Sequence, residues 1–505
     1  MISGAWRGLL LGALLSPLMA MPAARALEEI VIKIPLLDTD FTVRVGELRD
    51  PRTLRTGTSD LAELDRASGG AVGRELLALL NQPVPLSLAQ VANGSVGSPL
   101  LEQAMFVLSS LGTLEGRSPD LSGKTLRDAL IKASKNGEPT LLSLIEAIPG
   151  KRVILNLGRA RQIVSRMAQQ RQRAEQLLAA TPPANARVAP LLPRNDVLQS
   201  SYRLAVPHRA QPIELEVLQP RQGGNGHLVL VSHGLWDGPA SFQGWGTFLA
   251  GQGYTVILPR HPGSDKTQQQ EVLTGEAPPP GPEELALRPK DLKAVMDAVE
   301  AGRLGGFIGV DASHVVVIGH SWGATSALQL AGVRPKQGDL LARCGKKDDP
   351  SRNLSWTLQC SWLKGVDQAA LQDSRVIAVA AVSPPVSLLF PRGSGQNLSA
   401  RVLLVSGGRD WVVPPDPEAV TPMEWGSRLG NRLVLVQGGD HFNLRPGSSA
   451  NGGVLGPLLL AWTNAAFASG AAVRPSQGAV NLLPANGWGS ALMPMADVTD
   501  KLNRP

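Results

Sequence analysis

Six short apolar runs between residues 200 and 470 constrain the fold more than any other feature of the chain. They read LVLVSHG (228–234), TVILPRH (255–261), HVVVIGH (314–320), VIAVAAVS (376–383), VLLVSGG (402–408) and LVLVQGG (433–439). Helical stretches separate them, and continuous β-branched runs of this kind are typical of strands buried on both faces. We therefore expect an α/β fold over residues 200–473: a mostly parallel sheet with helices on both faces and functional residues just after the strands.

The first 26 residues have the pattern of a signal peptide. Arg7 supplies the positive charge, residues 9–21 form a short apolar core, and small residues precede an expected cleavage after Ala26. The sequence therefore predicts export, with the mature protein periplasmic, associated with the outer membrane or secreted. Retention as a membrane anchor is the alternative, which the shortness of the apolar core disfavours.

Three further segments differ in composition from the six-run region. Residues 27–180 predict a mainly helical N-terminal domain of unknown function that opens with a β-hairpin around Asp38–Asp40. Residues 181–199 are Pro-rich and predict a linker. Residues 474–505 have no strong periodicity and are expected to be a C-terminal tail, whereas the uncharged stretch 454–473 is interpreted as a packed core helix.

Charge and aromatic content limit the partners. The formal net charge is +7 over 505 residues and only 4% of residues are aromatic, so neither a basic nor a stacking platform for nucleic acid is expected. Arginines between Arg159 and Arg173 lie largely off the apolar stripe of a predicted helix. They indicate either a solvated helix face or a docking surface for an anionic membrane or an acidic partner.

Export would place the two cysteines in an oxidising compartment. Cys344 and Cys360 are close in sequence, which favours a local disulfide over two buried thiols. The bridged segment follows the predicted nucleophile helix and is a candidate lid. No cysteine and histidine cluster has the spacing of a metal site, and no cofactor is expected.

The motif Gly319-His320-Ser321-Trp322-Gly323 carries the expected chemistry. It follows the run HVVVI and precedes the helical stretch ATSALQLAG. A G-x-S-x-G in a sharp turn from strand to helix lifts the serine hydroxyl above the sheet, where it acts as a nucleophile. Ser321 is therefore the candidate nucleophile.

Chain order then selects the other members of a triad, because in this architecture the acid and the histidine follow the serine. His441 is the only histidine after Ser321, and it stands just past the last run. Asp410 follows the preceding run and is the candidate acid. Asp416 is the alternative, and Asp440 is disfavoured because it adjoins the histidine. His441 would take the proton of Ser321 while Asp410 orients the imidazole.

The run LVLVSHGLW supplies one half of an oxyanion hole. Two backbone N–H groups are needed, and the expected donors are those of Trp322, next to the nucleophile, and Leu235, after His233-Gly234. His233 and His261 are interpreted as structural rather than catalytic, although His261 is a possible lining residue of the pocket.

Taken in order, SHGL, GHSWG, GGRDWVVP and GGDHF resemble the alpha/beta-hydrolase superfamily. They are most similar to the branch that contains platelet-activating factor acetylhydrolases and predicted dienelactone hydrolases. The stretch LALRPKDLKAVMDAV is similar to the R-P-x-D helix of that branch, whereas Trp322 and Ala324 replace its usual Phe and Gly. The layout also resembles exported hydrolases of photosynthetic bacteria that carry an unassigned N-terminal helical domain.

The resemblance implies an exported serine hydrolase that cleaves short-chain or lipid-like carboxylic esters through an acyl-enzyme. Ser321 in place of a cysteine argues against dienelactone hydrolysis itself. Two other classes stay open: an acyltransferase, haloperoxidase or lyase with the same triad, and a non-catalytic binding protein on a hydrolase scaffold.

Overall fold

The computed structural model describes residues 26–34, 39–81, 112–116, 124–134, 139–155, 157–186, 196–274, 276–305, 309–346, 349, 351–365, 371–395, 398–426, 430–469 and 481–502. Residues 1–25 of the predicted signal peptide and residues 187–195 of the predicted linker lie outside these ranges. No helix within the described ranges has the length and apolar character needed to cross a membrane.

The six apolar runs form six adjacent strands of one nine-stranded sheet with the order β13-β12-β11-β10-β9-β7-β8-β6-β5. All pairings among these six strands are parallel, so the predicted α/β fold is confirmed. Their bounds are β7 His227–Ser232, β8 Thr255–Pro259, β9 Asp311–His320, β10 Val376–Val382, β11 Arg401–Gly407 and β12 Arg432–Val436.

Three antiparallel strands complete the edges of this sheet. β5 (Val197–Leu204) pairs with β6 (Ile213–Pro220), which pairs with β8, and β13 (Met495–Asp497) pairs with β12. β5 therefore begins inside the segment expected to be a linker, and the segment expected to be a tail contributes an edge strand. Both expectations were too simple, because edge strands are short, alternate with polar residues and lack a continuous apolar run.

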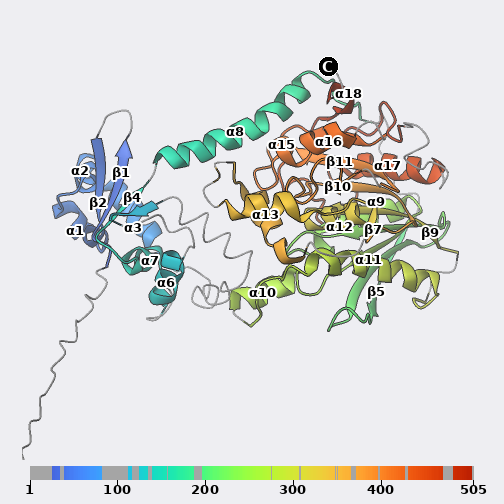
Figure 1. Ribbon diagram of the computed structural model, residues 1–505, viewed down its shortest axis with the longest axis horizontal. Coiled ribbons are helices and arrows are strands. Elements are labelled where there is room, and N and C mark those ends of the chain that lie inside the picture. The colour runs from blue at the N-terminus through green and yellow to red at the C-terminus, as the bar shows by residue number, and fades with distance from the viewer. Residues whose placement is uncertain are drawn as a thin grey trace, which may run out of the picture.

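Alternate side chains of each central strand enter two separate cores, one on each face of the sheet. Leu228 and Leu230 point to the face covered by α11 (Glu284–Glu300) and α12 (Trp322–Leu330), whereas Val229 and Val231 point to the opposite face. α9 (Gln243–Gly251) and α17 (Gly456–Ser469) cover that opposite face, so the uncharged stretch after residue 454 does contain a packed helix. Helices thus cover the sheet on both faces (Figure 1).

Shorter helices surround these layers. They are α10 Lys266–Thr274, α13 Gln337–Gly345, α14 Leu354–Cys360, α15 Pro415–Glu418, α16 Val420–Gly426 and α18 Thr499–Leu502, with 3-10 turns at Pro239–Phe242 and Leu363–Gly365.

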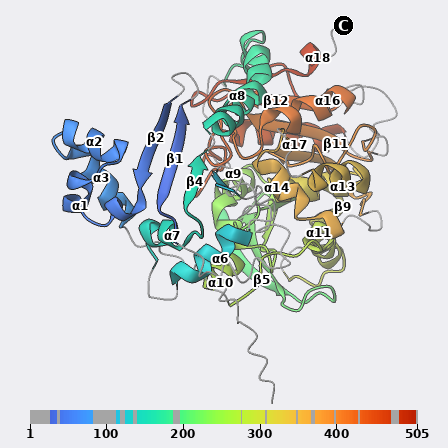
Figure 2. The ribbon, with the colours of Figure 1, turned by 60° about the vertical axis from the view of Figure 1, so that its left-hand side comes forward.

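The N-terminal region, residues 26–155, is a separate mixed sheet with helices on its flank (Figure 2). The predicted hairpin is present as β1 (Glu29–Ile34) and β2 (Thr39–Arg44). β4 (Arg152–Leu155) pairs in parallel with β1, and β3 (Gly112–Leu114) pairs antiparallel with β4, so the region contains more strand than the sequence suggested. Such short strands give too few alternations to be recognised before folding.

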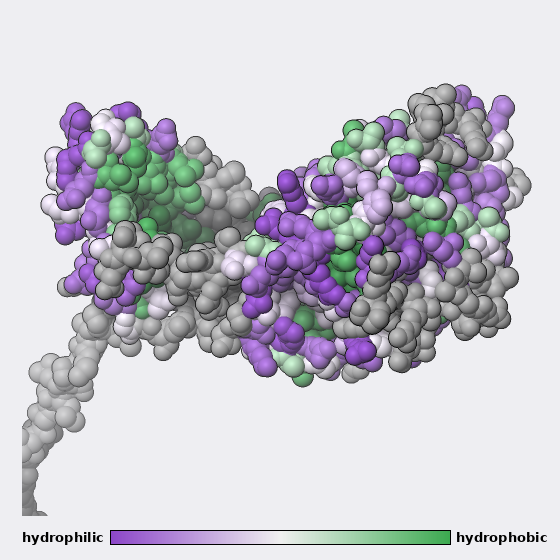
Figure 3. Space-filling view, turned by 90° about the horizontal axis from the view of Figure 1, so that it is seen from above, coloured by the Kyte–Doolittle hydropathy of each residue, from purple (hydrophilic) through white to green (hydrophobic). Residues whose placement is uncertain are grey.

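Five described helices and one 3-10 turn belong to this N-terminal region. They are the turn Val45–Leu48 and the helices α1 Pro51–Thr56, α2 Asp60–Ala67, α3 Ala71–Leu80, α6 Lys124–Ala133 and α7 Leu141–Ala147. Seen from above, a patch of apolar side chains shows on the N-terminal region beside the hollow that separates it from the larger part (Figure 3).

α8 (Leu157–Ala179) joins the two parts, and its C-terminal half packs on the large sheet region (Figures 1 and 2). Ala174 is fully buried in the core beneath α11 and α12. Arg173 pairs with Asp416, at 3.4 Å, and with Glu424. One of the predicted arginines, whose side chain is 38% exposed, therefore contacts acidic residues of the chain itself.

Candidate active site

Ser321 stands at the turn between β9 and α12, at the centre of the sheet. Its φ of 53° and ψ of −121° are rare for a residue with a side chain. Holding such a conformation costs on the order of 1–3 kcal/mol, and structures retain that cost mainly at functional sites. The backbone is held by the Ser321 N–H, which donates to the carbonyl of Val382 at 2.9 Å. The predicted turn from strand to helix is present.

The two glycines of the motif allow this turn to close. A Cβ on Gly319 would lie 2.2 Å from the carbonyl oxygen of Gly323, and a Cβ on Gly323 would lie 2.1 Å from that of Ser232. Neither distance is tolerated by a real side chain. The spacing of the motif therefore reflects the close approach of strand β7, the serine turn and the start of α12.

The structure brings His441 and Asp410 together. The Nδ1 of His441 lies 3.0 Å from the Oδ2 of Asp410, and the other carboxylate oxygen accepts the backbone N–H groups of Val412 and Val413 at 3.0 and 2.8 Å. Asp410 is fully buried. These contacts fix the carboxylate and, through it, the orientation of the imidazole.

His320 places this pair beside the serine turn. Its ring lies 4.7 Å from the ring of His441, centroid to centroid, and its Nε2–H donates to the His441 carbonyl at 2.9 Å. Burial lowers the pKa of His320 well below its usual range, so the ring is neutral. Because His320 directly precedes Ser321, this hydrogen bond holds the histidine loop against the nucleophile turn.

The two alternative acids have other partners. Asp416 accepts a hydrogen bond from Thr421 Oγ1 at 2.6 Å and pairs with Arg173. Asp440 accepts the backbone N–H groups of Phe442 and Asn443, both at 2.8 Å, in a local turn. Asp410 is thus the one of the three candidates that has a hydrogen bond to His441 in the structure.

The expected oxyanion donors flank Ser321. A Cβ on Gly234 would lie 3.2 Å from the Cβ of Ser321, so the turn that carries Leu235 lies against the nucleophile. Among the described residues, no acceptor bonds the backbone N–H of Leu235 or of Trp322. Trp236, directly after Leu235, has a φ of 55°, which adds a second strained residue at this edge.

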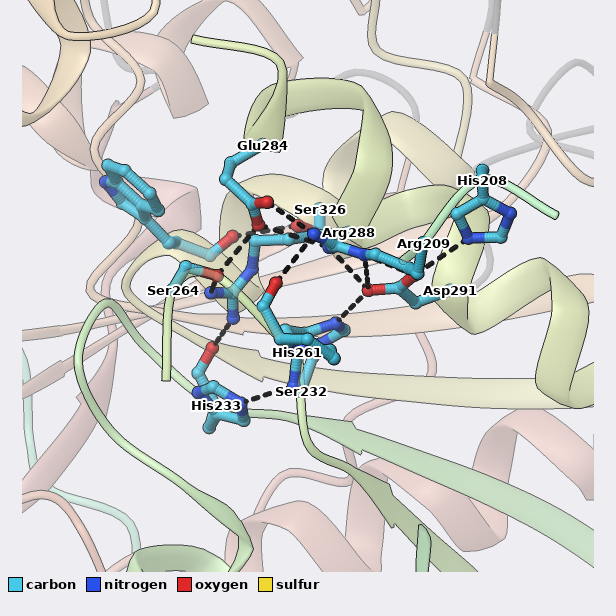
Figure 4. Close-up of polar contacts among 12 residues, drawn as sticks. His208, Arg209, Ser232, His233, His261, Ser264, Glu284, Arg288, Asp291 and Ser326 are labelled. Atoms are coloured by element: carbon cyan, nitrogen blue, oxygen red, sulfur yellow. Dashed lines mark hydrogen bonds and ion pairs between the residues drawn. The ribbon is translucent and has the colours of Figure 1, made fainter. Parts of the chain in front are cut away.

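A second group of serine, histidine and aspartate lies behind this turn and was not anticipated as a group (Figure 4). Ser232 Oγ lies 2.9 Å from Nε2 of His261, and Nδ1 of His261 lies 2.8 Å from Asp291. Its composition and hydrogen bonds are consistent with a Ser–His–Asp triad. All three residues, however, are completely buried.

The protonation of this buried group follows from its surroundings. Burial, together with the charge of Arg288, lowers the pKa of His261 to about 3, so the ring is neutral. For Asp291, burial acts to raise the pKa, but hydrogen bonds from His208, His261 and Arg209 outweigh it and lower the pKa. The ionised carboxylate can only accept, so His261 donates from Nδ1 and accepts the Ser232 hydroxyl at Nε2.

Two arginines and a second acid complete this buried cluster. Arg209 reaches Asp291 at 2.7 Å and also pairs with Glu284. Arg288 donates to Ser264 Oγ at 2.9 Å and to the carbonyl of His233. The two acids and two arginines balance in charge. The R-P-x-D stretch supplies Arg288 and Asp291, which the sequence did not connect with His261 because 27 or more residues separate them.

The predicted disulfide is present between Cys344 in α13 and Cys360 in α14. Trp356, inside the segment it closes, and Trp362, two residues after Cys360, are buried, and the Trp362 ring lies 4.5 Å from the ring of Trp322. Trp362 therefore supports the start of α12, whereas the lid role considered from the sequence stays a prediction.

Two aromatic side chains border the site on its solvent side. Trp411 follows Asp410 and is 44% exposed, and Phe442 follows His441 and is 48% exposed. Their ring centroids are 6.2 Å apart. No group of three or more His, Cys, Asp or Glu side chains in the described ranges is arranged to hold a metal ion.

The fold and this arrangement agree with comparisons to known families. Residues 26–156 match a model described as an alpha/beta hydrolase of unknown function (DUF1400). A search of curated proteins finds no match. Residues 228–494, more than half of the chain, match the model of the alpha/beta hydrolase family and include Ser321, Asp410 and His441. The protein therefore belongs to the alpha/beta hydrolase family.

Proposed function

We propose that the protein is a serine hydrolase of carboxylic esters, with Ser321 as nucleophile, His441 as base and Asp410 as the orienting acid. The observation that carries the proposal is the strained turn at Ser321, with φ 53°, between two unbonded backbone N–H groups and beside a histidine held on a buried carboxylate. A serine hydroxyl is a weak nucleophile unless a base takes its proton, and His441 is the proposed base.

The reaction then runs in two half-reactions. Ser321 Oγ attacks the ester carbonyl while His441 Nε2 takes the hydroxyl proton, and the N–H groups of Leu235 and Trp322 donate to the oxyanion. The intermediate collapses as His441 protonates the leaving alcohol, which leaves an acyl group on Ser321. Water attacks this acyl-enzyme with His441 again as base, releasing the carboxylic acid and restoring the serine hydroxyl.

Short-chain or lipid-like acyl esters are the proposed substrates. The exposed rings of Trp411 and Phe442 directly follow the acid and the base, and they offer apolar surface to an acyl chain. The motif resemblance to the platelet-activating factor acetylhydrolase branch supports the same substrate class. The second candidate function is transfer of the acyl group to an acceptor other than water, which uses the same residues. It is favoured because Ser321 is only 4% exposed, so that its acyl group would be shielded from water.

Ser232 is the alternative nucleophile, and its surroundings argue against it. Ser232 and His261 are both fully buried, and Ser232 is the last residue of β7, in register with Gly319. A substrate carbonyl would have to displace core residues to reach it. The hydrogen bonds of this group therefore support a structural role better than a catalytic one.

We also propose that the protein is exported, as its first 26 residues suggest. The disulfide supports this proposal, since such bonds persist in oxidising compartments. Contact of α8 with an anionic membrane would have to use arginines other than Arg173, which is engaged with Asp416 and Glu424. Sedimentation with vesicles of phosphatidylglycerol or of phosphatidylcholine tests this contact, and equal sedimentation with both would contradict it.

The decisive experiment labels the nucleophile. A fluorophosphonate probe should modify wild-type protein at Ser321, located by peptide mapping, and leave Ser321→Ala unmodified. A series of p-nitrophenyl esters from acetate to palmitate should then be hydrolysed by wild type and not by Ser321→Ala. Absence of both labelling and hydrolysis would favour a non-catalytic binding protein, and labelling at Ser232 would move the site to the buried group.

A further inference from the structure

Arg288 is a buried cation that the proposed mechanism does not use. It lies on the face of α11 that also carries Glu284 and Asp291, and its side chain reaches toward the end of strand β7 (Figure 4). It is almost completely excluded from solvent. Its Nη2 donates to the carbonyl of His233, and its Nη1 donates to Ser264 Oγ at 2.9 Å. Burying a guanidinium is costly, so these contacts call for an explanation.

Both contacts act on the turn that carries Leu235. The His233 carbonyl precedes Gly234, and the Ser264 backbone carbonyl accepts the N–H of Trp236 at 2.8 Å. The Ser264 hydroxyl accepts a hydrogen bond from Arg288 and donates one to Oε2 of Glu284 at 2.8 Å, which holds Ser264 in place. Arg288 therefore anchors the turn on both sides of Leu235, directly on one side and through Ser264 on the other.

The peptide between these anchors is oriented by His233. The His261 backbone N–H donates to Nε2 of His233 at 3.0 Å, so the proton of this neutral ring is on Nδ1. Nδ1–H donates to the carbonyl of Gly234 at 2.7 Å. In a trans peptide the C=O and the following N–H point in opposite directions. Holding the Gly234 carbonyl thus sets the direction of the Leu235 N–H.

The rest of the buried cluster holds Arg288 in place. Glu284 and Asp291 lie on the same face of α11, and Arg209 pairs with both of them. His261, whose backbone N–H binds the His233 ring, is fixed between Ser232 and Asp291. Within the cluster, only the Nε of Arg288 has no partner among the described residues. A charge-balanced cluster joined by this many hydrogen bonds is rigid, since movement would leave further buried polar groups unpaired.

We propose that Arg288 is a positioning residue of the oxyanion hole, which acts through the His233 carbonyl and Ser264 to aim the Leu235 N–H at the oxyanion. This inference rests on the proposed function, because it takes Leu235 and Ser321 as parts of the site. It assigns the buried Ser232–His261–Asp291 group to the support of the catalytic turn rather than to catalysis. Loss of Arg288 then lowers kcat and leaves KM nearly unchanged, since the oxyanion forms only in the transition state.

The test compares Arg288→Met and Arg288→Lys with Arg432→Met. Arg432 is the control: its side chain is 13% exposed, and it pairs with Asp497 at 2.6 Å and with Asp500, at the far edge of the sheet. All variants are measured with p-nitrophenyl acetate per active site titrated by the fluorophosphonate. We expect Arg288→Met to lose about 10²–10³-fold in kcat, as for a lost oxyanion donor, Arg288→Lys to recover part of it, and Arg432→Met to lower Tm alone.

Two further readouts separate positioning from folding. Hydrogen exchange of the peptide that contains residues 233–236 should be faster in Arg288→Met and unchanged in Arg432→Met. If Arg288→Met does not fold, Ser264→Ala is the smaller change to measure, and it should lower kcat and leave KM nearly unchanged. Wild-type kcat per titrated site and unchanged exchange in folded Arg288 variants would overturn the inference while leaving the proposed function standing. A wild-type protein that neither labels nor hydrolyses esters would instead remove the proposed function.

Discussion

Two groups of serine, histidine and aspartate lie on opposite sides of one turn. They share their composition but differ in backbone conformation and in hydrogen bonding. In the first, Ser321 has a rare backbone conformation, and its histidine loop is held by His320. In the second, Ser232 ends a regular strand, and His261 is fixed between Ser232 and Asp291. Hydrogen bonds alone would select the second group, since both of its contacts, at 2.9 and 2.8 Å, are complete.

A complete hydrogen-bond chain is therefore a weaker sign of catalysis than a strained serine beside unbonded backbone donors. Ser321 has such a strained conformation, and the turn that carries Leu235 lies against it. A buried serine whose hydroxyl is already committed, as Ser232 is, serves packing and rigidity. The strained conformation of Ser321 lies at the proposed nucleophile, in keeping with the tendency of such strain to occur at functional sites.

The largest expected difference separates the two serines. Ser321→Ala should lower ester turnover by up to about 10⁶-fold, as removal of a triad nucleophile does. Ser232→Ala should cost about 1 kcal/mol of stability for the lost hydrogen bond and less than about tenfold in kcat. Steady-state kinetics and urea unfolding of both variants measure this. The opposite ranking in kcat would assign catalysis to the buried group.

The acids should separate by about 10⁴-fold in turnover. Asp410→Asn keeps the shape of the side chain but supports the wrong tautomer of His441. Asp291→Asn should act mainly on stability, by about 3–5 kcal/mol, because it removes one of the two acids that balance the buried arginines. Asp416→Asn is the mild control, since its carboxylate contacts Thr421 and Arg173. A strong effect of Asp416→Asn on kcat, with a weak one for Asp410→Asn, would place the acid further along the loop.

Acid should destabilise the protein through the buried group. The native pKa of His261 is lowered to about 3, so below pH 6.5 the unfolded chain binds a proton that the native state does not. The free energy of unfolding therefore falls as pH drops from about 6.5 towards 3. Below about pH 4, Asp291 acts in the same direction, because its pKa is also lowered.

Urea unfolding of wild type and His261→Gln at pH 7, 5.5 and 4.5 measures this slope. We expect a shallower slope in His261→Gln, with the remainder due to His233 and His320, whose pKa values burial also lowers. Identical slopes would show that His261 is not the neutral, buried ring described above.

The smallest expected effect on turnover is that of the disulfide. Its loop of about 15 residues contributes about 3 kcal/mol in the chain-entropy model, so Cys344→Ala/Cys360→Ala should lower Tm clearly. Because Trp362 supports Trp322 from behind, turnover should fall less than about tenfold and the preference for acyl chain length should not change. A shift in that preference across the p-nitrophenyl series would support the lid interpretation.

Local patterns accounted for the centre of the fold and for the candidate triad. β7 to β12 were recognisable because strands buried on both faces need continuous apolar runs, and those runs are written in consecutive residues. Ser321, Asp410 and His441 were selected because a strand-to-helix turn has a short motif and the order of its partners along the chain is constrained. Their roles in catalysis stay predictions until the variants are measured.

Other features depend on contacts that no local pattern contains. β3, β4 and β13 are too short to show a period, and β5 and β6 lack the continuous apolar run of the central strands, so pairing with neighbours defines them as strands. The cluster around Arg288 gathers residues from 208 to 291, from two strand ends, a loop and a helix. Each residue type there is ordinary in a sequence. Only the tertiary structure decides that they lie together in one buried site. Burial excludes water, so these polar side chains must use one another as hydrogen-bond and charge partners.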